Sequence, residues 1–138
     1  MRNLIDITDF SVEEVTSVLD LADRIIADPA AWRDALHGRI LATLFFEPST
    51  RTRLSFESAM LSLGGSVLGF ASADSSSATK GETLTDTVHT VSCYCDIIAM
   101  RHPKEGAPMA ASFRGLVPII NAGDGGFMDG DESDAAYH

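Results

Sequence analysis

Four short apolar runs, each bounded by turn or helix signals, limit most strongly what this chain can fold into. Each run is five to eight residues long, which suits a buried strand. Segments with helical periodicity fill the intervals, so the order is strand–helix–strand–helix–strand–helix–strand. This order predicts an α/β fold: a parallel sheet of four strands, or slightly more, with right-handed crossovers and helices on both faces. The predicted strands cover residues 39–46, 66–70, 96–100 and 117–121.

A further helix precedes the first strand. Ser11 followed by Glu14 three residues later has the pattern of a capping box, and apolar residues recur on one helical face from there to residue 27. Pro29 ends this helix, and a short helical piece is expected over residues 30–36. The three helices between the strands are predicted over residues 51–63, 83–94 and 105–113.

The length and the charge of the chain narrow its class. A chain of 138 residues buries roughly two-thirds of its unfolded surface, so we expect a single domain with its own core. Twenty acidic against ten basic residues give a net charge of −10. Such a chain is a poor non-specific partner for nucleic acid or an anionic membrane surface. A site for an anion would therefore need a local cluster of the few cations.

The two cysteines, Cys93 and Cys95, form a C-x-C pair inside an apolar stretch. No second pair exists to build a disulfide framework or a zinc site, so we expect buried, reduced thiols. The first ten residues contain acids and no apolar core of a signal peptide. Both features favour a cytoplasmic protein. The sequence has no Walker loop and no cluster of metal ligands, so no metal or cofactor is expected.

The strongest chemical signal is the run PSTRTR, residues 48–53, which joins the first strand to a helix. The first turn of a helix has unpaired N–H groups and a partial positive charge, and Arg51 adds a planar fork suited to a phosphate. An ordinary Ser/Thr helix cap followed by exposed arginines explains the same residues, and the sequence leaves this alternative open. Arg51 and Arg53 are two residues apart and point in different directions, so one can reach a ligand while the other pairs with an acid. The hydroxyl side chains of the run are Ser49, Thr50 and Thr52.

Three weaker candidates lie near the ends of other strands. Lys80 follows a serine-rich loop and could reach a ligand as a point charge, although an exposed linker lysine is the simpler interpretation. Arg101-His102-Pro103 lies just past the third strand, where α/β sheets bind ligands, or else forms a surface turn. The glycines of residues 123–126 could admit a close backbone approach to a ligand or form a plain turn.

Four segments together resemble the N-terminal, carbamoyl-phosphate-binding domain of aspartate carbamoyltransferase. They occur in the family's order and spacing, and KGETL and RHPKEG favour the aspartate enzymes over the ornithine enzymes. The resemblance predicts a domain over residues 1–126 and an acidic tail, expected to be disordered, over residues 127–138. The four segments are FFEPSTRTRLSFESAMLSLGG (45–65), KGETLTDT (80–87), MRHPKEG (100–106) and VPIINAGDGG (117–126).

The resemblance implies a reaction in which the amine of L-aspartate attacks the carbonyl carbon of carbamoyl phosphate and phosphate leaves, an early step of pyrimidine synthesis. The resemblance implies that Thr52 and Arg101 contact the carbonyl oxygen of carbamoyl phosphate in addition to its phosphate. Ser76 and Lys80 match a loop that enters the site of a neighbouring subunit, which implies the trimer of the family. The residues implied to bind the phosphate in the chain's own site are Ser49, Thr50, Arg51, Thr52 and Arg101.

After Gly126 the chain departs from the family pattern. Asp129 and Glu132 occupy the positions of the family's carbonyl-polarising histidine and amide-contacting glutamine, and carboxylates would repel a developing oxyanion. The sequence also shows no match to the family's aspartate-binding segment or to the family's last helix, which packs back on this domain. We therefore expect carbamoyl phosphate binding without turnover by this chain alone, and an exposed apolar patch. Two alternatives stay open: a non-catalytic assembly module, and a phosphate-binding domain used for another carbamoyl or phosphoryl substrate.

Overall fold

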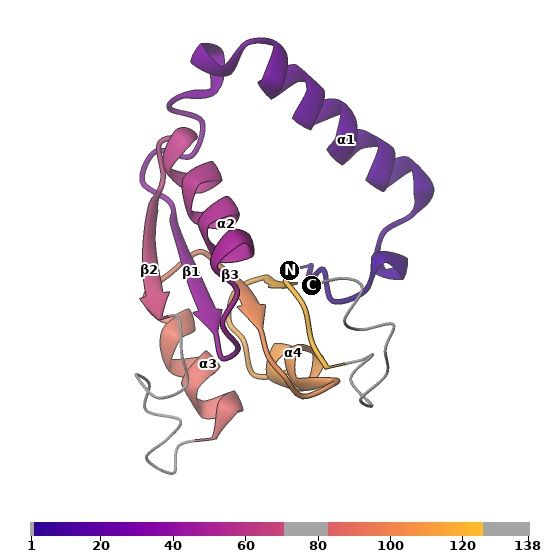
Figure 1. Cartoon of the computed structure of the whole chain (residues 1–138), viewed down its shortest axis with the longest axis vertical. Coiled ribbons are helices and arrows are strands. Elements are labelled where there is room, and N and C mark those ends of the chain that lie inside the picture. Colours follow the sequence, from indigo (N-terminus) through magenta and orange to yellow (C-terminus); the bar gives the residue numbers. More distant parts are fainter. Residues whose placement is uncertain (1, 71–82, 126–138) are drawn as a thin grey trace.

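The computed structural model describes residues 2–70 and 83–125, and these form a four-stranded parallel sheet with helices on both faces (Figure 1). The strand order is β2-β1-β3-β4, with every neighbouring pair parallel. The predicted α/β fold is therefore confirmed. The strands are β1 (Ile40–Phe45), β2 (Ser66–Phe70), β3 (Ile97–Arg101) and β4 (Ile119–Asn121). The helices are α1 (Val12–Ala27), α2 (Thr50–Ser62), α3 (Leu84–Ser92) and α4 (Ala107–Ser112), with short 3-10 turns at Ile7–Asp9 and Pro29–Trp32.

The two faces of the sheet bury separate apolar clusters because side chains alternate along a strand. On one face, Leu44 of β1 packs with Ile98 of β3 and Val88 of α3, and all three side chains are fully buried. On the other face, Leu41 of β1 packs with Met60 of α2. Each such aliphatic side chain contributes about 1.5–3 kcal/mol by its burial. The clusters hold α2 on one face and α3 with α4 on the other.

Several predicted boundaries were too wide, and the backbone explains why. The helix expected from residue 105 begins at Ala107, because Gly106 adopts a left-handed φ of 82° at the N-cap and Pro108 suits the first turn. The strand expected from residue 117 begins at Ile119, after Pro118, which has no N–H to donate to a sheet. The helical piece expected over residues 30–36 is the shorter 3-10 turn Pro29–Trp32.

Helix α1 confirms the predicted capping box, since the Ser11 side chain accepts from the Glu14 amide and Glu14 reaches back to the Ser11 amide. Its apolar stripe, however, lies outside the core. No residue of α1 is buried, and Val12 and Ile26 are 79% and 76% exposed. In Figure 1, α1 lies apart from the sheet. The described domain thus exposes apolar side chains along this helix.

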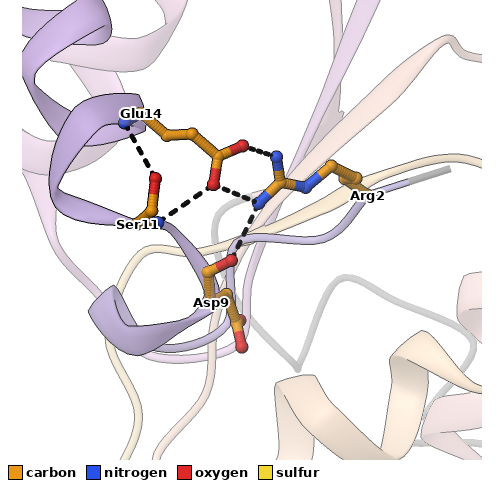
Figure 2. Close-up of polar contacts among 4 residues, drawn as sticks. All are labelled: Arg2, Asp9, Ser11 and Glu14. Carbon is orange, nitrogen blue, oxygen red and sulfur yellow. Dashed lines mark hydrogen bonds and ion pairs between the residues drawn. The ribbon is translucent and has the colours of Figure 1, made fainter.

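The N-terminal segment adds a contact at the edge of the sheet that the sequence did not suggest. Leu4 forms a parallel bridge with Ile120 beside β4. Figure 2 shows how Arg2 then joins this segment to α1: its guanidinium pairs with Glu14 and donates to the Asp9 carbonyl oxygen. Backbone N–H groups, chiefly that of Asp6, lower the pKa of the Asp9 carboxyl, which accepts from the amide of the N-cap residue Asp6 in the capping box of the first 3-10 turn. The polar contacts fix where α1 begins relative to the sheet.

The cysteines differ from the expectation of two buried thiols. Both are free, but Cys93 is exposed and only Cys95 is half-buried. Burial raises the pKa of the Cys95 thiol to about 11, so it stays protonated at neutral pH. Across the described ranges, no helix combines the length and the apolar character needed to cross a membrane.

Candidate functional site

The residues that follow β1 and β3 meet at one edge of the sheet. Phe45 is the register partner of Arg101, and the Phe46 amide donates to the Arg101 carbonyl oxygen over 2.9 Å. Ligands of parallel α/β sheets bind beyond this carboxyl edge. The sheet therefore brings the first turn of α2 and the side chain of Arg101 to neighbouring positions.

The first turn of α2 differs from the first turns of α1 and α3. Ser11 and Thr83 each cap a helix by accepting from the backbone amide three residues later. Ser49 is the N-cap residue of α2, but its side chain makes no capping hydrogen bond. The simple Ser/Thr cap that the sequence allowed is therefore not what the structure has. The Ser49 hydroxyl and the amides of the first turn stay available to an anion.

The two arginines of this turn have different environments, as their spacing predicted. Arg53 donates through Nε to Glu57 Oε2 over 2.9 Å, and the buried Thr43 hydroxyl donates to the same oxygen over 2.8 Å. This network ties α2 to the centre of β1. Arg51 is exposed, and none of the described carboxylates lies within ion-pair distance of its guanidinium. Arg51 is thus the arginine of the pair that can bind a ligand.

Arg101 is held at the edge of the sheet by a carboxylate, that of Glu47, which no sequence motif indicated. The Arg101 side chain is 18% exposed. Its guanidinium contacts Glu47 Oε1 at 3.2 Å from Nε and 3.1 Å from Nη2, and Nη1 donates to the Ala122 carbonyl oxygen over 3.4 Å. Glu47 lies just after β1, and Arg101 ends the adjacent strand. The pairing depends on which strands are neighbours, and no pattern near either residue indicates that. An anion that binds Arg101 must compete with Glu47.

Gly123 makes a close approach, but to Arg101 rather than to a ligand. Its φ is 133°, and a Cβ atom there would lie 2.9 Å from Arg101 Nη1. A side chain at this position would displace the guanidinium. The glycine turn predicted at residues 123–126 therefore shapes the site through Arg101, as far as the described residues extend.

His102 is half-buried beside Arg101. Its ring lies 5.1 Å from the Phe46 ring, centroid to centroid, and its Nδ1 accepts from the Lys104 amide over 3.0 Å. Burial, and next the charge of Lys104, lower the pKa of His102, while Glu47 and Asp124 act in the opposite direction. His102 is therefore neutral at pH 7, and its own hydrogen bond occupies Nδ1.

Comparison with known proteins tests the family resemblance of the four sequence motifs. Residues 2–127 match the profile of the family described as aspartate/ornithine carbamoyltransferase, carbamoyl-P binding domain. The chain belongs to this carbamoyltransferase family. The resemblance seen in four sequence motifs is confirmed over nearly the whole chain, and the parallel sheet described above is the fold of the domain.

Curated and solved members of the family are similar to this carbamoyltransferase domain. The aspartate carbamoyltransferase catalytic subunit of Lachnoclostridium phytofermentans is 61% identical over 126 residues, which are 91% of this chain and 41% of the relative. The catalytic subunit from M. jannaschii aligns with a TM-score of 0.82 at 50% identity, covering 91% of this chain and 42% of that chain. The Trypanosoma cruzi enzyme in complex with carbamoyl phosphate and aspartate aligns with a TM-score of 0.83 at 40% identity, covering 90% of this chain and 41% of that chain. The chain thus spans less than half the length of these relatives.

The structure describes some of the site residues that the family resemblance implies and not others. Ser49, Thr50, Arg51 and Thr52 lie together at the start of α2, and Arg101 ends the strand beside β1. Ser76 and Lys80, the residues expected to act in a neighbouring subunit, lie outside the described residues. A groove of about 320 Å³ lies elsewhere, between the N-terminal segment and α4, and its lining includes Arg2 and Asp9. The Arg2 guanidinium already donates to the Asp9 carbonyl oxygen and pairs with Glu14.

Proposed function

We propose that this domain binds carbamoyl phosphate at the carboxyl edge of β1 and β3, as the first half of an aspartate carbamoyltransferase. One observation supports the site above all: an uncapped helix N-terminus carries an arginine with no acidic partner among the described residues, next to the strand that ends in Arg101. Among the solved relatives, the T. cruzi enzyme has been crystallised with carbamoyl phosphate. The site offers the donors that a phosphoryl group requires.

The proposed roles follow from the chemistry of each group. The amides of the first turn of α2 and the hydroxyls of Ser49, Thr50 and Thr52 donate to phosphate oxygens, and Arg51 neutralises their charge. Arg101 moves from Glu47 to the ligand, where it contacts both the phosphate and the carbonyl oxygen, and Thr52 donates to the same carbonyl oxygen. These donors stabilise negative charge that develops on the carbonyl oxygen and on the leaving phosphate. Ser76 and Lys80 complete the site of a neighbouring subunit.

The full reaction would join carbamoyl phosphate and L-aspartate into N-carbamoyl-L-aspartate and phosphate. The described residues supply donors for the first substrate only. The groups that hold aspartate would come from the part of the relatives, more than half of their length, that this chain does not match. We therefore expect residues 1–138 alone to bind carbamoyl phosphate without forming N-carbamoyl-L-aspartate.

Replacing Arg51 with alanine should weaken carbamoyl phosphate binding roughly 10- to 30-fold. A hydrogen bond to a charged group contributes about 1.5–3 kcal/mol; Arg51 is exposed, so we take the lower part of this range, about 1.5–2 kcal/mol, and 1.4 kcal/mol is tenfold in affinity. Isothermal titration calorimetry on the wild type and on Arg51→Ala measures the change. Arg33→Ala is the matched control, because it removes an exposed arginine from another part of the chain. Absence of binding by the wild type, or equal binding by Arg51→Ala, would refute the proposal.

A second function, a non-catalytic assembly module, is favoured by a separate observation. Leu54 and Leu61 lie on α2 and are 54% and 60% exposed, and Leu68 of β2 and Tyr94 after α3 are exposed as well. Exposed apolar side chains of this kind also suit the homotrimer that the family resemblance implies. Sedimentation at increasing concentration should show self-association, and a monomer at the highest concentration would count against both the module and the trimer.

The free cysteines support a place in the cytoplasm.

A further inference from the structure

We propose that His102, in its neutral form, is a positioning residue for Arg101: it shapes the turn after β3, and this turn packs against the loop after β4 that contacts the guanidinium. This inference rests on the proposed function, because it concerns the same carbamoyl phosphate site. His102 itself is assigned no contact with the ligand. The proposal depends on how its imidazole, the turn of residues 102–106 and the loop of residues 122–125 pack together.

The imidazole organises the turn from within. Nδ1 accepts the Lys104 amide over 3.0 Å, which places the ring proton on Nε2 in the neutral form. The ring rests against Phe46, whose amide is bound to the Arg101 carbonyl oxygen. The backbone amide of His102 donates to the Gly123 carbonyl oxygen over 3.0 Å. One residue therefore links the end of β1, the turn after β3 and the loop after β4.

The turn and the loop fit each other closely. The Gly106 amide donates to Asp124 Oδ2 over 3.2 Å. Gly125 approaches the backbone so closely that an added Cβ would overlap the Pro103 carbonyl oxygen. The other side of the same loop faces the arginine, since the Ala122 carbonyl oxygen accepts from Arg101 Nη1. A change in the turn is therefore transmitted through this loop to the guanidinium.

The charge state of His102 controls the bond that it accepts. The charged groups around the ring are Glu47 after β1, Arg101 at the end of β3, Lys104 within the turn and Asp124 after β4. Burial and Lys104 keep the pKa of His102 below its usual value, so the neutral form is present at and above neutral pH. On protonation Nδ1 carries a proton that points at the Lys104 N–H, and the hydrogen bond is lost. The turn is therefore held at high pH and released as the pH falls through the lowered pKa.

The test uses sulfate, a tetrahedral dianion whose charge does not change over roughly pH 5 to 8. The affinity of the wild type for sulfate should be constant near pH 8 and should fall roughly fivefold as the pH is lowered toward 5, as expected for one lost hydrogen bond. His102→Phe keeps a ring against Phe46 but has no acceptor, so it should bind roughly fivefold more weakly at pH 8, without a further fall. His102→Asn can accept from the amide two residues on, as an Asx turn does, so it should regain most of that affinity and should not respond to pH. His37→Asn controls for the other histidines and should keep the wild-type profile.

The outcomes separate the two proposals. Equal affinity of His102→Phe and the wild type, or a wild-type pH profile in His102→Asn, overturns the role of His102 and leaves the anion site intact. A wild type that does not bind sulfate, or whose binding is indifferent to Arg51→Ala, overturns the proposed function instead. Circular dichroism checks that each variant is folded. If His102→Phe does not fold, the comparison of the wild type with His102→Asn across pH decides the question.

Discussion

Substituting alanine for Gly69 is expected to destabilise the domain by about 4 kcal/mol, a large part of the 5–15 kcal/mol typical of a whole domain. Gly69 lies in β2 opposite Thr43 of β1, with a φ of 144°. A Cβ atom there would overlap the Thr43 carbonyl oxygen and lie 2.8 Å from the Thr43 nitrogen. Both obstacles are backbone atoms of the central strand, which cannot move without breaking the sheet. Urea unfolding followed by circular dichroism measures the loss.

Gly38→Ala is the control that separates the close contact from backbone strain. Gly38 also has a left-handed φ, 84°, but a Cβ atom added there would meet no other atom within 4 Å. Its substitution should cost only the strain, about 1–2 kcal/mol. Equal destabilisation by the two substitutions would contradict the view that contact with Thr43 makes Gly69 necessary.

Loss of Arg101 should have the largest effect on ligand binding, about a hundredfold for carbamoyl phosphate. Arg101→Ala removes the donors directed at the ligand, which accounts for roughly tenfold or more. It also leaves the Glu47 carboxylate without its partner at the edge of the site, where it repels an anion. Arg51→Ala lacks this second effect, because no described carboxylate pairs with Arg51. Calorimetry on both variants compares the two losses.

Glu47→Gln should act in the opposite direction and raise the affinity about threefold, because a neutral amide competes less well for the guanidinium of Arg101. In the double variant Glu47→Gln with Arg101→Ala, part of the lost affinity should return. A glutamine variant that binds as weakly as Arg101→Ala would show that Glu47 orients the arginine rather than restrains it.

The parts of the fold that local sequence patterns determine were predicted well. The periodicity of apolar residues predicted the order of strands and helices, and the capping box at Ser11 and Glu14 predicted where α1 begins. The spacing of Arg51 and Arg53 was enough to predict that only one of them pairs with an acid, and the structure identifies Glu57 as that acid. These features depend on residues that are near one another in the chain.

The features that were missed depend on contacts between distant residues. Glu47 and Arg101 meet because β1 and β3 are neighbours in the sheet, and Leu4 bridges Ile120 across nearly the whole described chain. The apolar face of α1 predicts a helix but not what covers it, and the described residues leave it exposed. Likewise, the sequence presents Gly123 as a turn residue, whereas the structure shows it against the Arg101 side chain.

Amide chemical shifts recorded during a titration with carbamoyl phosphate test the central claim most directly. If the anion binds the N-terminus of α2, the largest shifts should fall on the amides of Thr50, Arg51 and Thr52, with smaller shifts near Arg101. The amides of α1 should stay unchanged. Shifts confined to the groove beside Arg2 and Phe113, or no shifts at a saturating concentration, would contradict the account.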